Sequence, residues 1–233
     1  MPIKKQDFIE ITYVGRLADT QEIFDTTDQK LAGQAGLTHH AHFGPQVVCV
    51  GERHVLPGLD DKFVGADLGP HKWSIQAQDA FGKKDASLIQ MIPASQFKKQ
   101  RIQPVQGMQL DVDGQIGVVK IASGGRVLVD FNHPLAGKDI TYEVTIHKVV
   151  TDPKAKLKAL LDLSLHTHTE LPITMNDDEA TVELPSKLPD DAAAKFSEHL
   201  CKLTGIKKVS FTSGKKPDKP AKNLNKEEGT AAE

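Results

Sequence analysis

Hydrophobic and polar residues alternate along residues 8–17, where the apolar Ile9, Ile11 and Tyr13 are separated by polar side chains. Successive side chains of a β-strand point to opposite faces, so this pattern predicts a half-buried strand with Tyr13 on its core face. The same alternation returns at residues 140–146 and predicts a second strand of similar character. Two such strands, far apart in the sequence, favour a mainly antiparallel sheet.

A short helix is predicted after Leu56, because Pro57 suits the first position of a helix. Leu56, Leu59 and Phe63 then share one helical face, and Gly65 is a suitable end. A short apolar run at residues 47–51 and the alternation of Trp73, Ile75 and Ala77 predict a strand on each side of this helix.

The segments between the first strand and residue 47 are predicted to be connections without regular structure. Residues 18–27 form a polar turn that ends in Phe24 and Asp25, and a loop rich in Gly and His follows.

Residues 83–131 differ from the segments on either side, since prolines and glycines divide them into short apolar runs. Asp113-Gly114 and Gly124-Gly125 are typical hairpin turns between these runs. The simplest interpretation is a small β-rich unit that interrupts an all-β domain, whose last strand rejoins the first sheet.

The pattern becomes helical at Asp152, a suitable N-cap that is followed by Pro153 at the first helical position. A strand, a second helix closed by Gly205 and a last strand follow, so residues 152–212 are predicted to form a small α/β domain. Residues 213–233 show no periodicity and are expected to be a disordered tail.

Composition narrows the possible functions. The chain has 233 residues, with 29 Lys and Arg against 31 Asp and Glu, and a net charge of −2. This balance does not favour general binding of nucleic acid, and no apolar run approaches the roughly 20 residues of a membrane span. A polar start and two distant cysteines fit a cytoplasmic protein without a disulfide framework. Phosphate-binding, hydrolase and zinc-protease motifs are missing from the sequence.

Four segments together resemble the FKBP family of peptidyl-prolyl isomerases: Ile11-Thr12-Tyr13-Val14-Gly15-Arg16-Leu17, Phe24-Asp25-Thr26, Val50-Gly51-Glu52-Arg53-His54-Val55-Leu56-Pro57-Gly58-Leu59 and Asp79-Ala80-Phe81-Gly82. The insert after Gly82 and the segment Val129-Asp130-Phe131-Asn132-His133-Pro134-Leu135-Ala136-Gly137 resemble the SlyD-type subfamily, in which an insert-in-flap chaperone domain lies within the FKBP domain. This resemblance covers residues 6–150, and the added C-terminal domain resembles that of long archaeal members.

The resemblance implies an α+β fold, with an FKBP-like antiparallel sheet wrapped on a short helix. The expected domains are a discontinuous isomerase domain, an inserted small β-rich domain and the small α/β domain, at residues 1–82 with 132–151, 83–131 and 152–212. The cytoplasmic protein would then be a peptidyl-prolyl isomerase and folding chaperone that acts on unfolded or proline-containing polypeptides. No cofactor, nucleic acid or membrane is expected, and the C-terminal domain is a candidate for self-association.

The resemblance also assigns roles to individual residues. The residues expected at the catalytic centre are Tyr13, Asp25, Phe81 and Tyr142. The residues expected to bind substrate around it are Phe24, Val55, Leu56, Leu59 and His133. Leu59 stands where many FKBPs have a tryptophan, and Phe81 where many have a tyrosine.

The insert is rich in apolar residues for its size, and a unit of about fifty residues buries them poorly. We therefore expect Met91, Phe97 and Met108 to bind unfolded segments.

Two alternatives to the isomerase remain at this point. One is a non-enzymatic holdase on an FKBP scaffold. The other is a metallochaperone that uses the cluster His39, His40 and His42, since imidazole suits Ni, Cu or Zn. Some SlyD-type proteins bind nickel through a tail of His and Cys, but the tail here contains neither residue.

Overall fold

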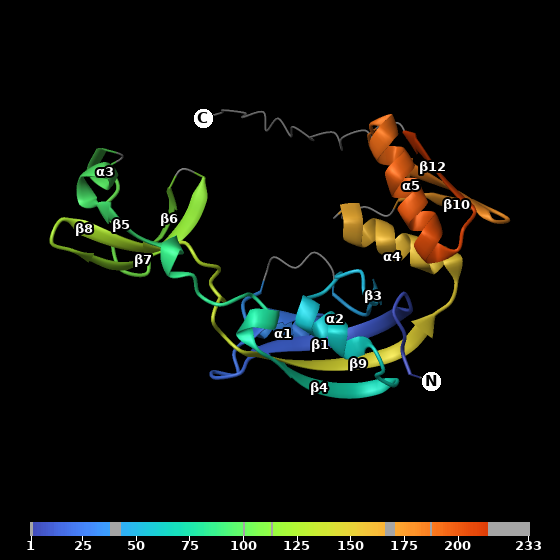
Figure 1. The fold of residues 1–233 in the computed structure, drawn as a ribbon, viewed down its shortest axis with the longest axis horizontal. Coiled ribbons are helices and arrows are strands. Elements are labelled where there is room, and N and C mark those ends of the chain that lie inside the picture. The colour runs from blue at the N-terminus through green and yellow to red at the C-terminus, as the bar shows by residue number, and fades with distance from the viewer. Residues whose placement is uncertain are drawn as a thin grey trace, which may run out of the picture. The chain divides into compact units, whose positions relative to one another are not determined.

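The computed structural model describes residues 2–37, 43–99, 101–112, 114–165, 171–186 and 188–213. The chain divides into two compact units, Met1–Ser164 and Leu165–Glu233 (Figure 1). Within the described ranges, no helix is long and apolar enough to cross a membrane. The histidine cluster at residues 39–42 and the tail from residue 214 lie outside the described residues.

A five-stranded antiparallel sheet forms the base of the first unit. The strand order is β2-β1-β9-β4, and β3 also pairs with β1. Strand β9 follows the insert in sequence but lies in the middle of the sheet, so the predicted return of the chain to its first sheet is confirmed (Figure 1). The strands are β1 (Phe8–Leu17), β2 (Ile23–Thr26), β3 (Gln46–Cys49), β4 (Gly69–Ile75) and β9 (Ile140–Val150).

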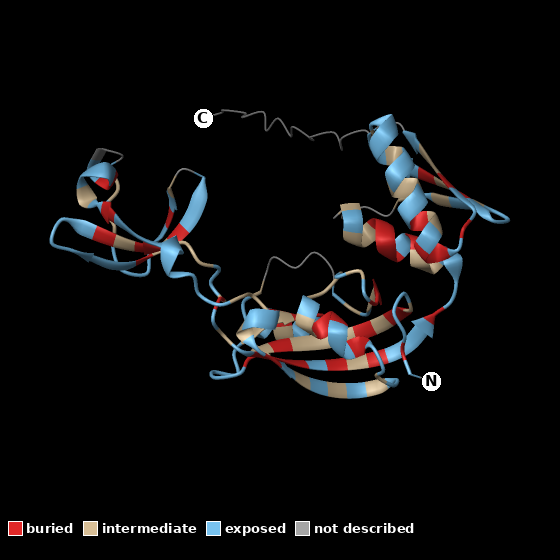
Figure 2. Cartoon of the chain, in the orientation of Figure 1, coloured by how far each residue is buried: buried red, intermediate tan, exposed pale blue. Residues whose placement is uncertain are grey.

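Helix α2 (Pro57–Phe63) packs on the five-stranded sheet, and the two together enclose the hydrophobic core of this part of the chain. Leu59 and Phe63 are fully buried with the inward residues of β1 and β9, which appear as buried positions in Figure 2. Gly58 allows close packing, because a Cβ there would lie 2.6 Å from Cγ2 of Ile75 and 2.7 Å from the carbonyl oxygen of Asp79. The predicted helix is therefore confirmed, with Pro57 at its first position.

The sequence missed two elements before this helix. The sequence pattern predicts a turn at residues 18–27, but Ile23–Thr26 form strand β2. The loop that was expected next contains a short helix, α1 (Gln29–Gln34). Its N-cap is Asp28, whose carboxylate accepts hydrogen bonds from the N–H groups of Lys30 and Leu31 at 2.8 and 3.1 Å.

The insert contains a second antiparallel sheet of four strands in the order β5-β8-β7-β6. The predicted Gly124-Gly125 turn joins β7 to β8, and both glycines have positive φ, as such a turn requires. A small apolar core includes Ile92, Phe97 and Val129. The elements of the insert are η2 (Ala86–Leu88, a 3-10 turn), β5 (Ile89–Pro93), α3 (Ala94–Lys99), β6 (Gln109–Val112), β7 (Gln115–Ser123) and β8 (Arg126–Asp130). Another 3-10 turn, η1 (Ala77–Asp79), precedes the insert.

Helix α4 (Pro153–Leu165) begins as predicted, since the carboxylate of Asp152 accepts a hydrogen bond of 2.9 Å from the N–H of Ala155. Most of α4 falls within the first unit. There the ammonium of Lys156 lies 5.4 Å from the centre of the Phe8 ring.

The second unit has a three-stranded sheet in the order β10-β11-β12, in which β11 and β12 are parallel. Helix α5 connects these two strands, and Gly205 ends it in the left-handed conformation. The predicted α/β character is confirmed, although β10 was missed. The elements are β10 (Ile173–Asn176), β11 (Glu179–Leu184), α5 (Asp190–Thr204) and β12 (Lys208–Ser213).

Candidate active site

Two tyrosines lie on the neighbouring strands β1 and β9. In their register, Tyr13 pairs with Val144 and Tyr142 pairs with Gly15. The two rings meet edge to face, with centroids 5.6 Å apart and planes at 71°. Tyr142 is buried and Tyr13 is half-buried. These two residues are the only tyrosines of the chain.

Phe24 of β2 joins this pair to a fourth ring. Its centroid lies 5.7 Å from that of Tyr142 and 5.6 Å from that of Phe81, in both cases edge to face. Tyr13, Phe24, Phe81 and Tyr142 are called the aromatic cluster below. Segments distant in sequence thus bring together four of the predicted site residues.

Gly15 is a part of this arrangement that the sequence reasoning missed. A Cβ at this position would lie 2.8 Å from Cζ of Phe24 and 3.0 Å from Cε1 of Tyr142. Real Cβ atoms do not approach rings so closely, so only glycine lets both rings lie over the backbone of β1. A glycine inside an otherwise regular strand pattern is the signal that could have identified it.

Asp25, next to Phe24 on β2, interacts with both tyrosines. The hydroxyls of Tyr13 and Tyr142 donate hydrogen bonds to its carboxylate. Burial, and secondly the charge of Asp25, raise the pKa of both phenols well above the usual value. Both tyrosines therefore remain neutral hydrogen-bond donors at physiological pH.

The loop before α2 positions Val55 and Leu56, which are partly buried against the same core as the aromatic cluster. Asp60, on α2 and almost fully buried, fixes this loop. Its carboxylate accepts hydrogen bonds of 3.0 Å from the N–H groups of both Gly51 and Arg53. Sequence reasoning missed Asp60, because an acidic residue in the first turn of a helix is ordinary in itself.

Leu59, on the same helix, is 1% exposed and packs within the core. It therefore supports the cluster from the inside of the domain.

His133 lies beside Phe81, at the point where the chain returns from the insert. The two rings are stacked, with centroids 4.7 Å apart and planes at 4°. Nδ1 of His133 accepts a hydrogen bond of 3.2 Å from the N–H of Leu135, which fixes the orientation of the imidazole. The predicted position of His133 at the edge of the site agrees with this contact.

The chemistry of the site is thus apolar and aromatic, with one carboxylate whose hydrogen bonds fix the two phenols. In the part of the chain that the structure describes, no group of three or more His, Cys, Asp or Glu side chains could hold a metal ion. Such a site can bind an apolar ring in a fixed orientation without forming a covalent bond to it.

Comparison with known proteins agrees with this geometry. A probable FKBP-type 16 kDa peptidyl-prolyl cis-trans isomerase of Pseudomonas fluorescens is 33% identical over 108 residues, which cover 44% of this chain and 71% of the relative. The chain belongs to the FKBP-type peptidyl-prolyl cis-trans isomerase family. A short-type peptidyl-prolyl cis-trans isomerase of Methanocaldococcus jannaschii is 26% identical over 149 residues, or 63% of this chain and 94% of the relative. The SlyD isomerase of Treponema pallidum is 28% identical over 167 residues, or 69% of this chain and 86% of the relative.

The insert of this FKBP chain has a match of its own. A family model described as "FKBP26, IF domain" matches residues 90–135. Of the residues expected to bind unfolded segments there, Met91 is 60% exposed and Met108 is 36% exposed. Phe97 is 4% exposed and belongs to the core of the insert. The binding roles of all three residues stay predictions.

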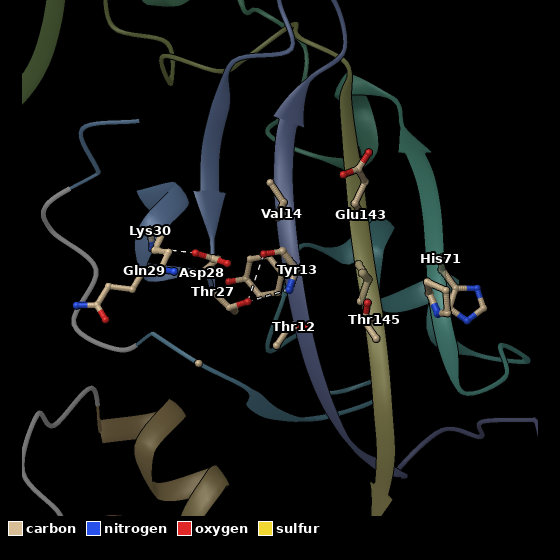
Figure 3. A pocket seen from close by; sticks show the side chains of 13 residues that line it. Thr12, Tyr13, Val14, Thr27, Asp28, Gln29, Lys30, His71, Glu143 and Thr145 are labelled. Carbon is tan, nitrogen blue, oxygen red and sulfur yellow. Dashed lines mark hydrogen bonds between the residues drawn. The ribbon is translucent and has the colours of Figure 1, made fainter. Parts of the chain in front are cut away.

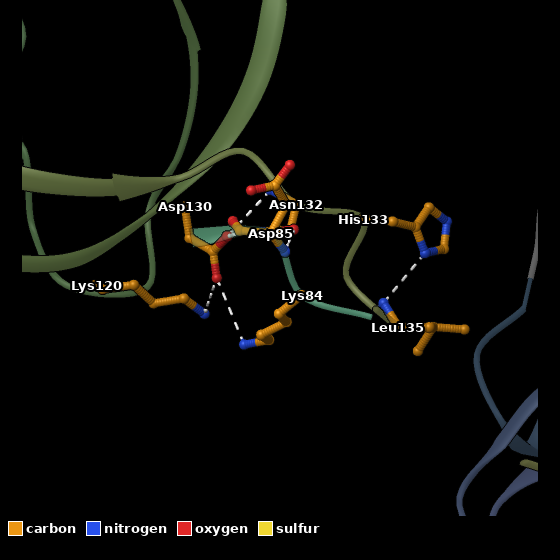
Figure 4. Close-up of polar contacts among 7 residues, drawn as sticks. All are labelled: Lys84, Asp85, Lys120, Asp130, Asn132, His133 and Leu135. Carbon is orange, nitrogen blue, oxygen red and sulfur yellow. Dashed lines mark hydrogen bonds and ion pairs between the residues drawn. The ribbon is translucent and has the colours of Figure 1, made fainter. Parts of the chain in front are cut away.

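Hydrogen bonds join the two segments that connect the insert to the FKBP sheet (Figure 4). The N–H of Asp85 donates to the Asn132 side chain at 2.8 Å, and the amide of Asn132 donates to the carbonyl of Asp85 at 3.0 Å. Asp130 is buried beside them and pairs with Lys84 and Lys120 at 3.5 and 3.7 Å. Burial raises the pKa of Asp130. The hydrogen bonds from Asn132 and the positive charges of Lys84 and Lys120 outweigh this effect, so the pKa is lowered overall.

A separate cavity of about 700 Å³ lies on the FKBP sheet (Figure 3). Its walls include Thr12 and Val14 of β1, which alternate with the inward-facing Ile11, and Glu143 of β9. Tyr13 is the one predicted site residue that also lines it. The cavity therefore borders the aromatic cluster through Tyr13, and the other three residues of the cluster do not line it.

Proposed function

We propose that this protein is a peptidyl-prolyl cis-trans isomerase that acts on the X–Pro bonds of unfolded polypeptides. The observation that carries the proposal is the aromatic cluster, in which Asp25 holds the hydroxyls of Tyr13 and Tyr142. The names of the relatives, which are peptidyl-prolyl cis-trans isomerases, support the same reaction.

The reaction needs no nucleophile. Rotation about a peptide bond faces a barrier of about 18–20 kcal/mol, because resonance keeps the amide planar. The planar amide is also the more dipolar form, so water stabilises it more than the twisted one. A site of apolar rings removes this stabilisation, and a shape that fits the twisted bond lowers the barrier further. Burial and the charge of Asp25 keep the two phenols neutral, and the hydrogen bonds that they donate to Asp25 hold them in place. Phe24 and Phe81 provide the apolar surface.

The insert supports a second role, the binding of unfolded chain. Exposed large apolar side chains are concentrated there, on strands and on the connections between them. Surfaces of this kind on a small unit are typical of interaction sites. The exposed apolar residues of the insert are Leu88, Ile89, Met91, Val105, Met108, Ile116 and Ile121.

We assign these roles to separate domains. Residues 1–82 with 132–151 would hold the isomerase site, and residues 83–131 would hold the chaperone site. Residues 152–212 would form the third domain, for which self-association remains a prediction. A client held by the insert keeps its prolines near the isomerase site, and such tethering raises the effective concentration without a new contact at the site.

The experiment compares two substrates. Replacement of residues 84–130 by a short loop should leave isomerisation of a proline tetrapeptide unchanged, and should sharply reduce catalysis of proline-limited refolding. Asp25→Ala in the full chain is the matched control, because it should slow both reactions while suppression of aggregation stays at the wild-type level.

The outcomes separate the isomerase from a holdase. Suppression of aggregation without isomerisation of either substrate would mean that the protein is a holdase on an FKBP scaffold. Refolding catalysis that survives removal of the insert would contradict the two-part mechanism.

A further inference from the structure

A groove of about 500 Å³ lies on the insert, apart from the aromatic cluster. It runs between the segment that follows α3 and the turn that joins β7 to β8. The turn consists of Gly124 and Gly125, which contribute no side chains and leave the groove open. The residues that line it are Ala94, Lys98, Arg101, Ile102, Gln103, Pro104, Ala122, Ser123, Gly124, Gly125, Arg126 and Val127.

The charged residues that line this groove are all positive. Lys98, Arg101 and Arg126 are exposed, and no Asp or Glu occurs among the residues that line the groove. Within the described ranges of the chain, none of these three cations forms an ion pair. Elsewhere on the insert, by contrast, Lys84 and Lys120 both pair with Asp130. The groove therefore presents uncompensated positive charge.

The backbone keeps Arg101 in an uncommon conformation. Its φ is +58°, which lies in the left-handed region that residues other than Gly, Asn and Asp adopt only at an energetic cost. Two hydrogen bonds fix this turn, from the N–H of Arg101 to the carbonyl of Lys98 at 3.0 Å and from the N–H of Ile102 to that of Phe97 at 2.9 Å. A long cation thus occupies a position at which glycine would be relaxed.

The groove also has apolar walls and borders the exposed apolar surface. Ile102, Pro104 and Val127 contribute to its lining. Arg126 connects the two features, because its Nη1 lies 3.8 Å from the sulfur of Met91, which is 60% exposed. A bound chain could therefore place an apolar side chain near Met91 and a charged one in the groove.

We infer that this cationic groove selects unfolded client segments in which Asp or Glu stands next to apolar residues. The inference rests on the proposed function, since it names the class of client that the insert prefers. The argument is charge complementarity, because carboxylates are the protein groups that three uncompensated cations attract. The expected role is to add selectivity to an apolar surface that would otherwise bind any unfolded chain.

The test uses two labelled unfolded peptides with the same apolar residues and no proline. One carries three Asp or Glu residues, and the other carries Lys at the same positions. The full-length protein should bind the acidic peptide about ten times more tightly at low salt, as expected for three exposed ion pairs. High salt should reduce this ratio. The triple variant Lys98→Gln, Arg101→Gln, Arg126→Gln should lose the preference and keep wild-type isomerisation of a tetrapeptide.

A matched control removes three cations outside the insert, by Lys154→Gln, Lys202→Gln and Lys208→Gln, and should keep the preference. Arg101→Glu with Arg126→Glu should reverse it in favour of the Lys peptide.

Each contrary result overturns the inference in a recognisable way. Equal binding of both peptides by the wild type refutes the acidic preference alone. Equal loss in the control variant shows that net charge is responsible. Binding of neither peptide refutes client binding by the insert as well. Tighter binding of a single-stranded oligonucleotide than of the acidic peptide would identify a general polyanion site instead.

Discussion

High pH tests the central feature of the site, the two buried phenols beside Asp25. Tyr13 and Tyr142 are the only tyrosines of the chain, so phenolate absorbance reports on the aromatic cluster alone. Burial and the Asp25 carboxylate raise the pKa of both phenols in the folded protein, whereas in the unfolded chain they ionise at about pH 10. The folded state therefore keeps two protons that the unfolded state releases.

This difference in protonation has a definite direction and size. A raised pKa stabilises the fold below the unfolded value, and this stability is lost as pH rises through the interval between the two values. With two such groups, the free energy of unfolding should fall by up to about 2.7 kcal/mol per pH unit above pH 10. The Cys49 thiol, whose pKa burial raises to about 12, would add to this loss, so the measurement uses the Cys49→Ala background.

The assay combines denaturant unfolding with phenolate absorbance between neutral pH and pH 12. Tyr142→Phe should reduce the slope to about 1.4 kcal/mol per pH unit, because one phenol remains. Asp25→Asn should shift the phenolate signal to lower pH, since the charge is removed while burial persists. A phenolate signal at pH 10 in the folded wild type, or an unchanged slope in Tyr142→Phe, would refute the buried geometry.

Three further predictions follow from close contacts. Gly15→Ala should lower the isomerase activity and reduce the free energy of unfolding by about 1–3 kcal/mol, because the added Cβ would clash with two rings. Gly33→Ala is the control: its Cβ would meet no atom within 4 Å, so activity should stay unchanged and stability should stay unchanged or rise slightly. Asp60→Ala should destabilise the protein by about 2–4 kcal/mol in denaturant unfolding, since two backbone N–H groups lose their acceptor. Truncation after Val150 should leave most tetrapeptide isomerase activity, and truncation after Leu165, which keeps α4, should be the more stable of the two on heating.

The regular elements of the fold could be predicted because their patterns are local. Alternation defines β1 and β9, and helix signals define α2, α4 and α5, including Pro57 and Gly205 at their ends. Short elements were missed, because four residues of β2 or β10 contain too few alternations to stand out. Their formation depends on a neighbouring strand that the local sequence does not reveal.

Most of the candidate site could be named only from the resemblance to FKBPs. Taken alone, Tyr142 is a buried strand residue like any other, and Asp25 follows an apparent turn. The contact of both tyrosines with one carboxylate depends on the register between strands that are distant in sequence. The same limit applies to the insert, where composition does not distinguish the buried Phe97 from the exposed Met91.

The connection between the isomerase site and the insert gives the proposed mechanism its physical basis. Phe81 belongs to the aromatic cluster, and the insert begins two residues later. His133 stacks on Phe81 just after the insert ends, and hydrogen bonds between Asp85 and Asn132 hold the two connecting segments together (Figure 4). A client bound by the insert, as proposed, would therefore be tethered through a short connection to the rings that would bind its proline. A short tether gives a high effective concentration, so weak binding by the insert is sufficient, and rapid release of the client is preserved.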